Sequence, residues 1–534
     1  MNISVKHALA IGLLLLVPAL KAAKAQSSGG PGGGTPPRVP RGIYAVVRIE
    51  EVLTKGYGSN PGYGDVPDPT PAVNSYLKTF YDFLLNNPAV SGLALQVHWD
   101  TLNPNPPGDA NAYSWDYVQD AFDRVENWNT KNPDNLKTIQ LIVAPGFNTP
   151  KWMLDEFYSC DPIFENAKRF LFIGCGKVTF TNFDEEDQAD GNVLPLPWNA
   201  TYQAAWKTFL QALAAKYNDQ TALVSVSVAG PTAVSAEMIL PSGDEVNQMQ
   251  FVSRGGTPGG ISANQMWIEL TQLFYYGEPS FQGTDQPFVA AWDHAIDTYG
   301  EIFSGLTLVA TTGNGLPNLA GGDTPPPGEF PDPGPPATPI NFATDCTADQ
   351  NMDCQAETQI LSYFVEAYPV GGSNAKATQT SGLEVQREGA YLGINGVKFL
   401  SQQTAAPPAG TSQVLGGAQF NTSVSKHANA EGCPEGETCS LNPDQALYDV
   451  LQDFFTETSI AGQYCEPEPQ APAFLNYLQI YYQDFVYAGV AKNEGQISVN
   501  SAGNSGNAAC GNVKMYFQGE LNAASTQLLG ITEP

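Results

Sequence analysis

The chain has 534 residues, a formal net charge of −30 and only 15% charged residues, with 52 glycines and 42 prolines. Its length suffices for one large barrel with insertions or for two domains. The acidic balance argues against nucleic-acid binding, because phosphate contacts require clustered Lys and Arg. It also disfavours anionic membrane surfaces. A neutral partner is the simplest expectation, and the composition suits a loop-rich extracellular protein.

The N-terminal region has the pattern of an export signal. Lys6 precedes an apolar run at 8–20, and a small-x-small site ends at Ala25. This pattern predicts a signal peptide over residues 1–25, cleaved after Ala25. The run is too short for a strong transmembrane helix, so no membrane insertion is expected. Residues 26–40, rich in Ser, Gly and Pro, are predicted to be a flexible linker. We therefore expect a secreted or periplasmic protein.

Eight cysteines, an even number, occur in the exported part. Export makes disulfides plausible. A zinc site is disfavoured because no CxxC occurs and the chain has only four His. We expect no metal and no cofactor. Proximity suggests four local pairs: Cys160 with Cys175, Cys346 with Cys354, Cys433 with Cys439, and Cys465 with Cys510.

Strand-like apolar runs alternate with helical patterns over residues 41–490, which is typical of βα units and a parallel sheet. Eight such steps predict an α/β fold, a (β/α)8 TIM barrel with long strand-end loops at 325–339 and 405–441. Residues 491–534 show little periodicity and are expected to be a small irregular C-terminal extension packed on the barrel. A monomer is expected. The predicted strands are 43–49, 93–97, 138–143, 223–228, 306–310, 377–381, 397–400 and 477–481.

Chemistry in such barrels lies beyond the C-terminal ends of the strands. Glu237 follows the fourth predicted strand by a few residues, which makes it a candidate acid, base or nucleophile. Aromatic faces combined with hydrogen-bonding side chains suit a sugar, and cleavage of a glycosidic bond requires two carboxyl groups. Candidate sugar-binding residues at the other strand ends are Gln96, His98, Trp99, Asn148, Trp152 and Tyr482.

Each of these residues also has a structural interpretation. Trp99 and Trp152 could be core aromatics, and His98 could be a satisfied structural histidine. Glu50 and Glu51 could cap the following segment or pair with Arg48, and Asp484 could form an ion pair beneath the pocket.

Three short motifs resemble those of clan A glycoside hydrolases. Residues 98–104 and 113–117 are similar to the second βα unit of family 42 beta-galactosidases, and 145–152 is similar to the third-strand loop of such enzymes. Residues 229–231 with Glu237 resemble the fourth-strand acid/base region, and also the glycine-proline-glutamate stretch of beta-amylases. The resemblance implies a (β/α)8 barrel that acts on an oligo- or polysaccharide, with Glu237 as general acid in a partly apolar pocket.

The chain departs from this pattern in two places. Ala236, rather than Asn, precedes Glu237, and the predicted seventh strand is followed by Gln402 and Gln403 instead of a carboxylate. A Gln amide cannot act as nucleophile or general base.

Three explanations remain open for the missing carboxylate. The second carboxylate comes from another strand, with Glu384 or Asp484 the nearest candidates. Alternatively, residues 378–384 form the seventh strand, or the protein binds glycans without cleaving them. The sequence therefore predicts a secreted glycoside hydrolase-like protein, with a non-catalytic carbohydrate-binding protein as the alternative.

Overall fold

The computed structural model divides into two units, residues 1–35 and 36–534, and every residue it describes belongs to the second. The described residues are 38–55, 73–160, 175–180, 192–242, 248–249, 261–277, 279–317, 319, 356–367, 375–386, 389–391, 415–420, 423–425, 447, 451, 475–490 and 517–529.

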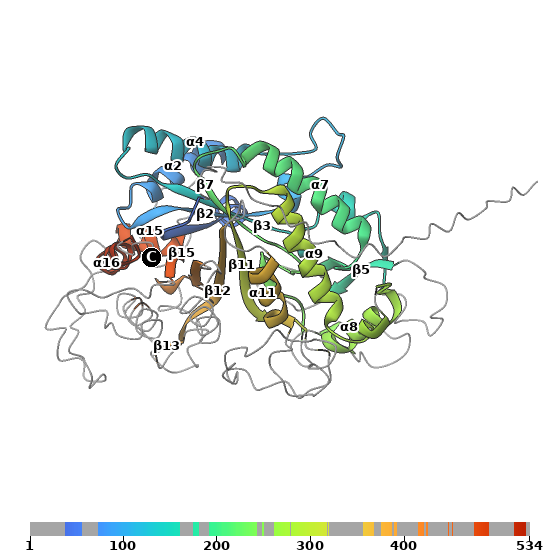
Figure 1. The fold of residues 1–534 in the computed structure, drawn as a ribbon. Coiled ribbons are helices and arrows are strands. Elements are labelled where there is room, and N and C mark those ends of the chain that lie inside the picture. Colours follow the sequence, from blue (N-terminus) through green and yellow to red (C-terminus); the bar gives the residue numbers. More distant parts are fainter. Residues whose placement is uncertain are drawn as a thin grey trace, which may run out of the picture. The chain divides into compact units, whose positions relative to one another are not determined.

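Eight parallel strands in the described part of the chain form a closed ring (Figure 1). Their order is β12-β14-β15-β1-β2-β3-β7-β11, and a parallel pairing of β11 with β12 closes the ring. The predicted (β/α)8 barrel is confirmed. The ring strands are β1 (Gly42–Arg48), β2 (Val90–His98), β3 (Thr138–Ala144), β7 (Leu223–Ser227), β11 (Thr307–Gly315), β12 (Ala375–Gln386), β14 (Leu415–Phe420) and β15 (Leu475–Tyr481).

Helices pack around the outside of the ring, as α2, α4, α7 and α9 show in Figure 1. Helix α4 buries Val118, Phe122 and Val125 at helical spacing, which turns one face towards the strands. Helix α7 begins after Asn199, whose side chain accepts hydrogen bonds from two backbone N–H groups of the first turn. The helices are α1 (Ile49–Lys55), α2 (Val73–Leu85), α3 (Trp99–Leu102), α4 (Asp116–Lys131), α5 (Lys151–Leu154), α7 (Ala200–Tyr217), α8 (Ala263–Phe274), α9 (Gln286–Ile302), α11 (Ala356–Ala367), α15 (Tyr482–Val490) and α16 (Phe517–Leu529), with 3-10 turns η1 (Gly146–Asn148) and η2 (Pro279–Phe281).

One contact identifies which side chains face the lumen of the barrel. Gln479 on β15 donates a hydrogen bond to Gln140 on β3 at 2.7 Å, although two strands separate them in the ring. The two amides therefore meet through the interior. Because side chains alternate along a strand and paired residues of parallel strands face the same way, this contact orients the neighbouring strands too.

The sixth and seventh strands differ from the prediction. Strand β12 lies between β11 and β14, so it is the sixth strand, and the idea that 378–384 forms the seventh is wrong. The seventh strand is β14, inside a segment predicted to be a loop. The predicted strand 397–400 lies outside the described residues. The β14 sequence, Leu-Gly-Gly-Ala-Gln-Phe, has no β-branched residue, so its strand propensity is weak.

The predicted chain boundaries also shift. The extension expected to be irregular contains helix α16, which buries Leu521, Ala524 and Leu528 in the main core. At the other end, Arg38, expected in the linker, already packs on the barrel. Its backbone N–H donates to Gly305 at 3.0 Å.

A second hydrophobic core lies in the long connections that follow the third, fourth and fifth strands. The sheet β4-β5-β6 packs with helix α8 there, around Phe180 and Trp267. A disulfide joins Cys160 to Cys175, which confirms one predicted pair. The sheet strands are β4 (Tyr158–Ser159), β5 (Cys175–Phe180) and β6 (Asn192–Pro195), and the remaining short strands are β8 (Glu237–Ile239), β9 (Gln248–Met249), β10 (Ile261–Ser262) and β13 (Gly389–Tyr391). The six other cysteines, Cys346, Cys354, Cys433, Cys439, Cys465 and Cys510, lie outside the described residues.

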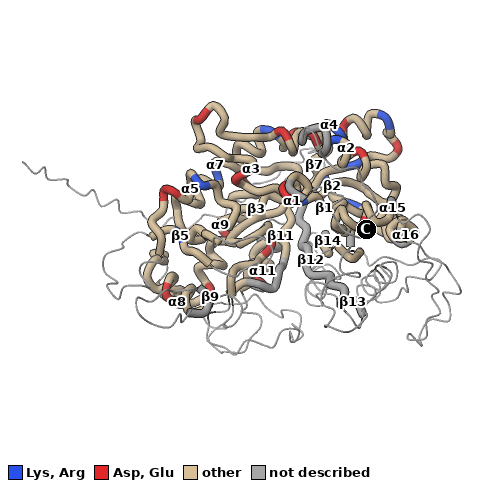
Figure 2. Tube along the Cα trace, turned by 180° about the vertical axis from the view of Figure 1, so that it is seen from behind, with Lys and Arg blue, Asp and Glu red and all other residues tan. Residues whose placement is uncertain are grey.

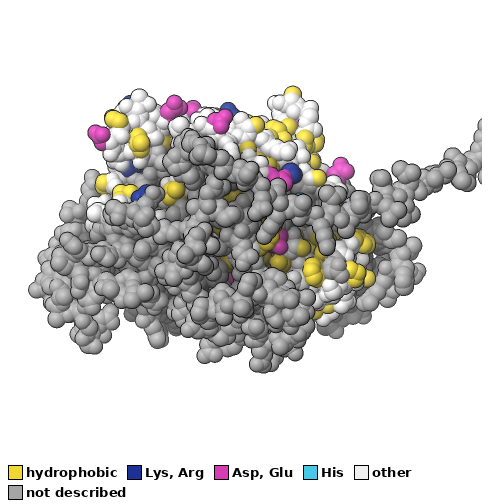
Figure 3. Space-filling view, in the orientation of Figure 1, with side chains coloured by type: hydrophobic (Ala, Val, Ile, Leu, Met, Phe, Trp, Pro, Cys, Tyr) yellow, Lys and Arg dark blue, Asp and Glu magenta, His cyan; other side chains and the backbone are white. Residues whose placement is uncertain are grey.

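Charged residues are distributed over the helices and loops of the described chain, whereas the ring strands carry few (Figure 2). On the face shown in Figure 3, the described Lys and Arg residues are scattered among Asp and Glu and form no basic patch. Within the described ranges, no helix is long and apolar enough to cross a membrane.

Candidate functional site at the barrel mouth

Glu237 lies in the column of the fourth barrel strand, beyond that strand's end. Strand β7 pairs with β11 at the level of residues 307–309. After a loop, Glu237 begins β8, which pairs with β11 further along, at Thr311. Strand β8 therefore continues the column of β7 towards the C-terminal end of the ring. This end is where barrel enzymes hold their catalytic residues.

Backbone hydrogen bonds fix the loop before Glu237. The Phe147 N–H donates to Ala233 at 2.8 Å, and the Ala233 N–H donates to Ile239 at 2.7 Å. Gly146 adopts φ +69°, and a Cβ there would lie 2.3 Å from the carbonyl oxygen of Thr232. Only glycine fits that position, so the third-strand loop and the Glu237 loop approach each other at van der Waals distance.

Side chains from three further ring strands form a hydrogen-bonded chain that ends at Glu237. Gln419 on β14 donates its amide to Glu237 at 3.4 Å and to the Tyr481 hydroxyl at 3.3 Å. Arg48 on β1 donates to the same hydroxyl at 2.8 Å, with its guanidinium 4.9 Å from the centre of the Tyr481 ring. We call Arg48, Glu51, Glu237, Gln419 and Tyr481 the mouth cluster.

The charges of the mouth cluster are coupled. The electrostatic interaction with Tyr481 is the main cause that raises the pKa of Arg48. Burial lowers this pKa, and the carboxylates of Glu51 and Glu237 raise it further. Burial raises the pKa of Tyr481, and Arg48 counteracts this. Arg48 thus lies within electrostatic reach of two carboxylates. Glu51 is held in turn by Gln483, whose amide donates to it at 3.3 Å.

Two predicted sugar-binding residues, Gln96 and His98, face the lumen side of β2. Ala94 is paired with the lumen residue Gln140, and every second residue after Ala94 points to the same face of the strand. The His98 side chain is 35% exposed, with one ring nitrogen 3.8 Å from Glu50 and the other 3.9 Å from Asp100. Burial raises the pKa of Asp100, His98 lowers it and Glu50 raises it.

The predicted aromatic platforms Trp99 and Tyr482 lie in the core instead. Trp99 is fully buried, with its ring 4.9 Å from that of Trp206, and Tyr482 is 2% exposed against Phe80. Tyr482 follows the lumen residue Tyr481 directly, so it leaves the strand on the opposite side. Neither ring has a free face for a sugar in this structure.

Two other predicted residues lie on the third-strand loop. Trp152 is half-buried, makes an edge contact with Trp99 and donates its indole N–H to Asn103 at 2.9 Å. Asn148 is half-buried in η1, next to Phe147, the residue that anchors the Glu237 loop.

The structure does not join Asp484 to Glu237 by any described contact. Asp484 is fully buried and accepts hydrogen bonds from Ser423 at 2.9 Å, Val424 at 3.1 Å and Ser425 at 2.8 Å. Burial raises its pKa to about 6, against these hydrogen bonds. The backbone of Glu384 pairs with β13, and its side chain lies outside the description.

Sequence reasoning missed Gln419 and Tyr481 and gave Arg48 only a pairing role with Glu50 or Glu51. Once Gln479 is known to face the lumen, alternation along β15 identifies Tyr481. Gln419 pairs with Gln479 and therefore faces the lumen too. Tyr44 also pairs with Gln479, and Arg48, four residues further along the same strand, faces the same way as Tyr44. Within the described ranges, no group of three His, Cys, Asp or Glu residues could hold a metal ion.

No protein-family model and no curated protein sequence matches the chain. Solved structures that match the chain include the catalytic domain of beta-amylase from Paenibacillus polymyxa, with 9% identity, TM-score 0.35, and coverage of 83% of this chain and 93% of that chain. A GH5_18 protein from Bifidobacterium longum matches with 10% identity, TM-score 0.32, and coverage of 83% and 70%. Endo-glycoceramidase II from Rhodococcus sp. matches with 10% identity, TM-score 0.27, and coverage of 72% and 68%.

The class of the fold, a (β/α)8 barrel, follows from the closed ring of strands itself.

Proposed function

We propose that this protein is a secreted glycoside hydrolase-like protein that acts on an oligo- or polysaccharide at the mouth of the barrel. The observation that carries the proposal is a hydrogen-bonded chain from three ring strands. Arg48 donates to Tyr481, and Gln419 donates to both Tyr481 and the carboxylate of Glu237. Amide, hydroxyl and guanidinium groups can bind sugar hydroxyls, and the carboxylate beside them can stabilise the positive charge of an oxocarbenium-like transition state.

The surroundings of Glu237 favour a different role from the general acid suggested by the sequence. A general acid needs an apolar setting that keeps it protonated. The described neighbours of Glu237 are instead an amide donor and a nearby guanidinium, which both stabilise the ionised form. We therefore assign Glu237 as the nucleophile or general base.

Glu51 is our candidate for the second carboxyl group. It shares Arg48 with Glu237 as an electrostatic neighbour and is oriented by Gln483. Glu384 stays a candidate for the same role. Asp484, enclosed by the segment 423–425, would support that loop rather than touch substrate.

The test is a panel of oligo- and polysaccharides incubated with the wild-type protein and with the Glu51→Gln variant. We expect new reducing ends from at least one glycan. For the variant we expect a roughly 10²–10⁴-fold lower rate, the usual effect of losing an acid/base group. Glu126→Gln, an exposed change on α4, is the matched control and should leave the rate unchanged. A variant with the wild-type rate would exclude Glu51.

A second candidate function is glycan binding without cleavage, and Gln419 specifically favours it. This amide stands at the end of the seventh strand, beside Glu237, where no carboxylate is supplied. If the wild-type protein binds a panel member but releases no reducing ends after prolonged incubation, the non-catalytic function is supported and the hydrolase proposal fails.

Export belongs to the same proposal. The predicted signal peptide, residues 1–25, and the Cys160–Cys175 disulfide support an oxidising compartment. The substrate would then be an extracellular or periplasmic glycan.

A further inference from the structure

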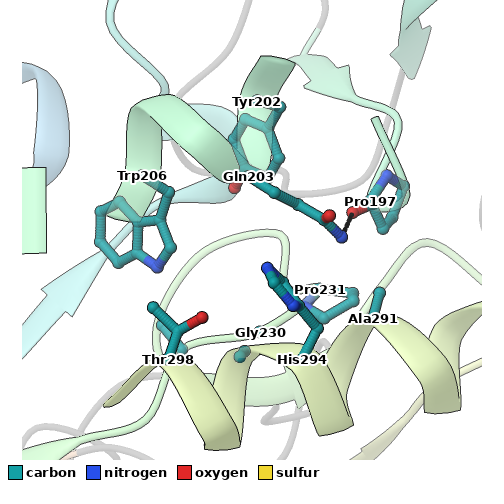
Figure 4. Close-up of a pocket in the computed structure, with 11 residues that line it drawn as sticks. Pro197, Tyr202, Gln203, Trp206, Gly230, Pro231, Ala291, His294 and Thr298 are labelled. Atoms are coloured by element: carbon teal, nitrogen blue, oxygen red, sulfur yellow. Dashed lines mark hydrogen bonds between the residues drawn. The ribbon is translucent and has the colours of Figure 1, made fainter. Parts of the chain in front are cut away.

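We propose that a pocket between helices α7 and α9 binds the acetyl group of an acetylated sugar, at a subsite separate from the mouth cluster. The inference rests on the proposed function only in taking the ligand to be a sugar. The pocket is a small, half-open cavity of about 20 Å³ (Figure 4). It has room for one small chemical group rather than for a whole sugar ring. Its lining includes Tyr202, Gln203, Trp206, Pro231, His294 and Thr298.

A buried donor points into this pocket. Trp206 is 6% exposed, and its indole N–H is buried without a hydrogen-bond partner. Figure 4 shows this nitrogen directed towards the space between α7 and α9. An indole N–H can only donate, so its complement is an acceptor such as a carbonyl oxygen. Leaving a buried donor unpaired is costly, and a ligand acceptor would relieve that cost.

The donor is held in a fixed direction. The Trp206 ring packs edge-on against Trp99 with centroids 4.9 Å apart and stacks on Phe209 at 5.2 Å. These contacts come from the main core, so the indole cannot turn away without disrupting it. A ligand would therefore meet a preorganised donor.

The rest of the lining selects a small neutral group. Ala229, Pro231, Ala291 and Ala295 supply apolar walls, and the lining contains no Asp, Glu, Lys or Arg. A carbonyl acceptor attached to a methyl group satisfies both features, with the oxygen on Trp206 and the methyl against the alanines. His294 also lines the pocket and is exposed, so the polar sugar ring would remain in water beside it.

The pocket wall is part of the loop that leads to Glu237. Gly230 has no room for a Cβ, which would lie 2.5 Å from the Trp292 ring. The Trp292 indole donates to Pro231 at 3.1 Å, which holds this wall in place. The subsite is thus adjacent in the chain to the candidate active site but uses none of the mouth cluster.

The test compares N-acetylglucosamine with glucose, which lacks the acetyl group, by NMR titration of the full-length protein. Because the mouth cluster could also take a single sugar, the titrations use Glu237→Gln as well as wild type. We expect N-acetylglucosamine to bind both proteins equally and at least fivefold more tightly than glucose.

Two variants separate the pocket from other sites. Trp206→Phe keeps the ring and removes the donor, so binding should weaken about fivefold, as for loss of one neutral hydrogen bond. Ala295→Leu fills the cavity and should abolish binding. Trp128→Phe, which removes an indole N–H on α4, is the matched control and should change nothing.

Equal affinity for glucose, or unchanged binding in Ala295→Leu, would overturn the inference. A titration with N-acetylglucosamine that changes no chemical shift would also overturn it, because the pocket would then hold only solvent. If Trp206→Phe does not fold, Ala295→Leu decides. A wild-type protein that cleaves glycans but does not bind N-acetylglucosamine at the pocket would contradict this inference and leave the hydrolase proposal intact. A protein that binds the probe at the pocket but cleaves nothing would leave the inference intact and contradict the hydrolase proposal.

Discussion

At the scale of single residues, one-position differences decide which side chains form the site. Tyr481 and Tyr482 are neighbours in the sequence, yet Tyr481 contacts Arg48 and Gln419 in the mouth cluster, whereas Tyr482 packs on Phe80. Composition and strand ends identified the right segment. The choice between the two residues required the phase of the alternation, which only a cross-barrel contact such as Gln140–Gln479 reveals.

Asp484 makes a pH-dependent contribution to stability. Its pKa is about 6 in the folded protein because of burial and about 3.9 when unfolded. The folded state therefore holds this proton more tightly, and the contribution is fully present below about pH 4 and is lost as the pH rises through 6. The difference corresponds to about 3 kcal/mol.

We predict that Asp484→Asn removes this dependence. The free energy of unfolding of wild type, relative to the variant, should fall by about 2 kcal/mol between pH 4 and pH 7. Urea unfolding of both proteins across this range measures it. A difference that stays constant, or rises with pH, would show that burial does not raise the pKa of Asp484.

At the scale of elements, the connections beyond the strands carry structure of their own. The β4-β5-β6 sheet and α8 form a second core, with Cys160 and Cys175 bonded inside it. The spacing of the two cysteines predicted their bond, because nearby residues in an exported chain pair readily. The sheet itself follows no strong periodic pattern, and its existence depends on packing against α8.

The disulfide gives a prediction for this second core. Loop-closure entropy for the 15-residue separation corresponds to about 3 kcal/mol, so the double variant Cys160→Ser, Cys175→Ser should be destabilised by about that much. Protein recovered from the culture medium should begin at Gln26 and carry the bond, as seen by intact mass before and after reduction. A free thiol pair, or an N-terminus at Met1, would contradict the export proposal.

At the scale of the whole molecule, the barrel was predictable because six of its eight strands are apolar or β-branched runs of sufficient length. Strand β14 was not, because Gly416, Gly417 and Ala418 give a weak local signal. Pairing explains it: Tyr477 of β15 fills the space where a Cβ at Gly417 would lie, 2.2 Å away. Long-range pairing, rather than local propensity, specifies this strand.

The candidate site was predictable in part for the same reason. Glu237 followed from its position after a buried strand, but the residues that surround it arrive from β1, β14 and β15, far away in the sequence. Only closure of the ring brings them together.

The measurement that bears most directly on the central claim is turnover of Glu237→Gln on a glycan that the wild-type protein cleaves. Gln keeps the size of the side chain and removes its charge. We predict a roughly 10²–10⁴-fold loss of kcat, with an unchanged Tm and with Glu126→Gln at the wild-type rate. Full turnover by a folded Glu237→Gln variant would contradict the assignment of this carboxylate to catalysis.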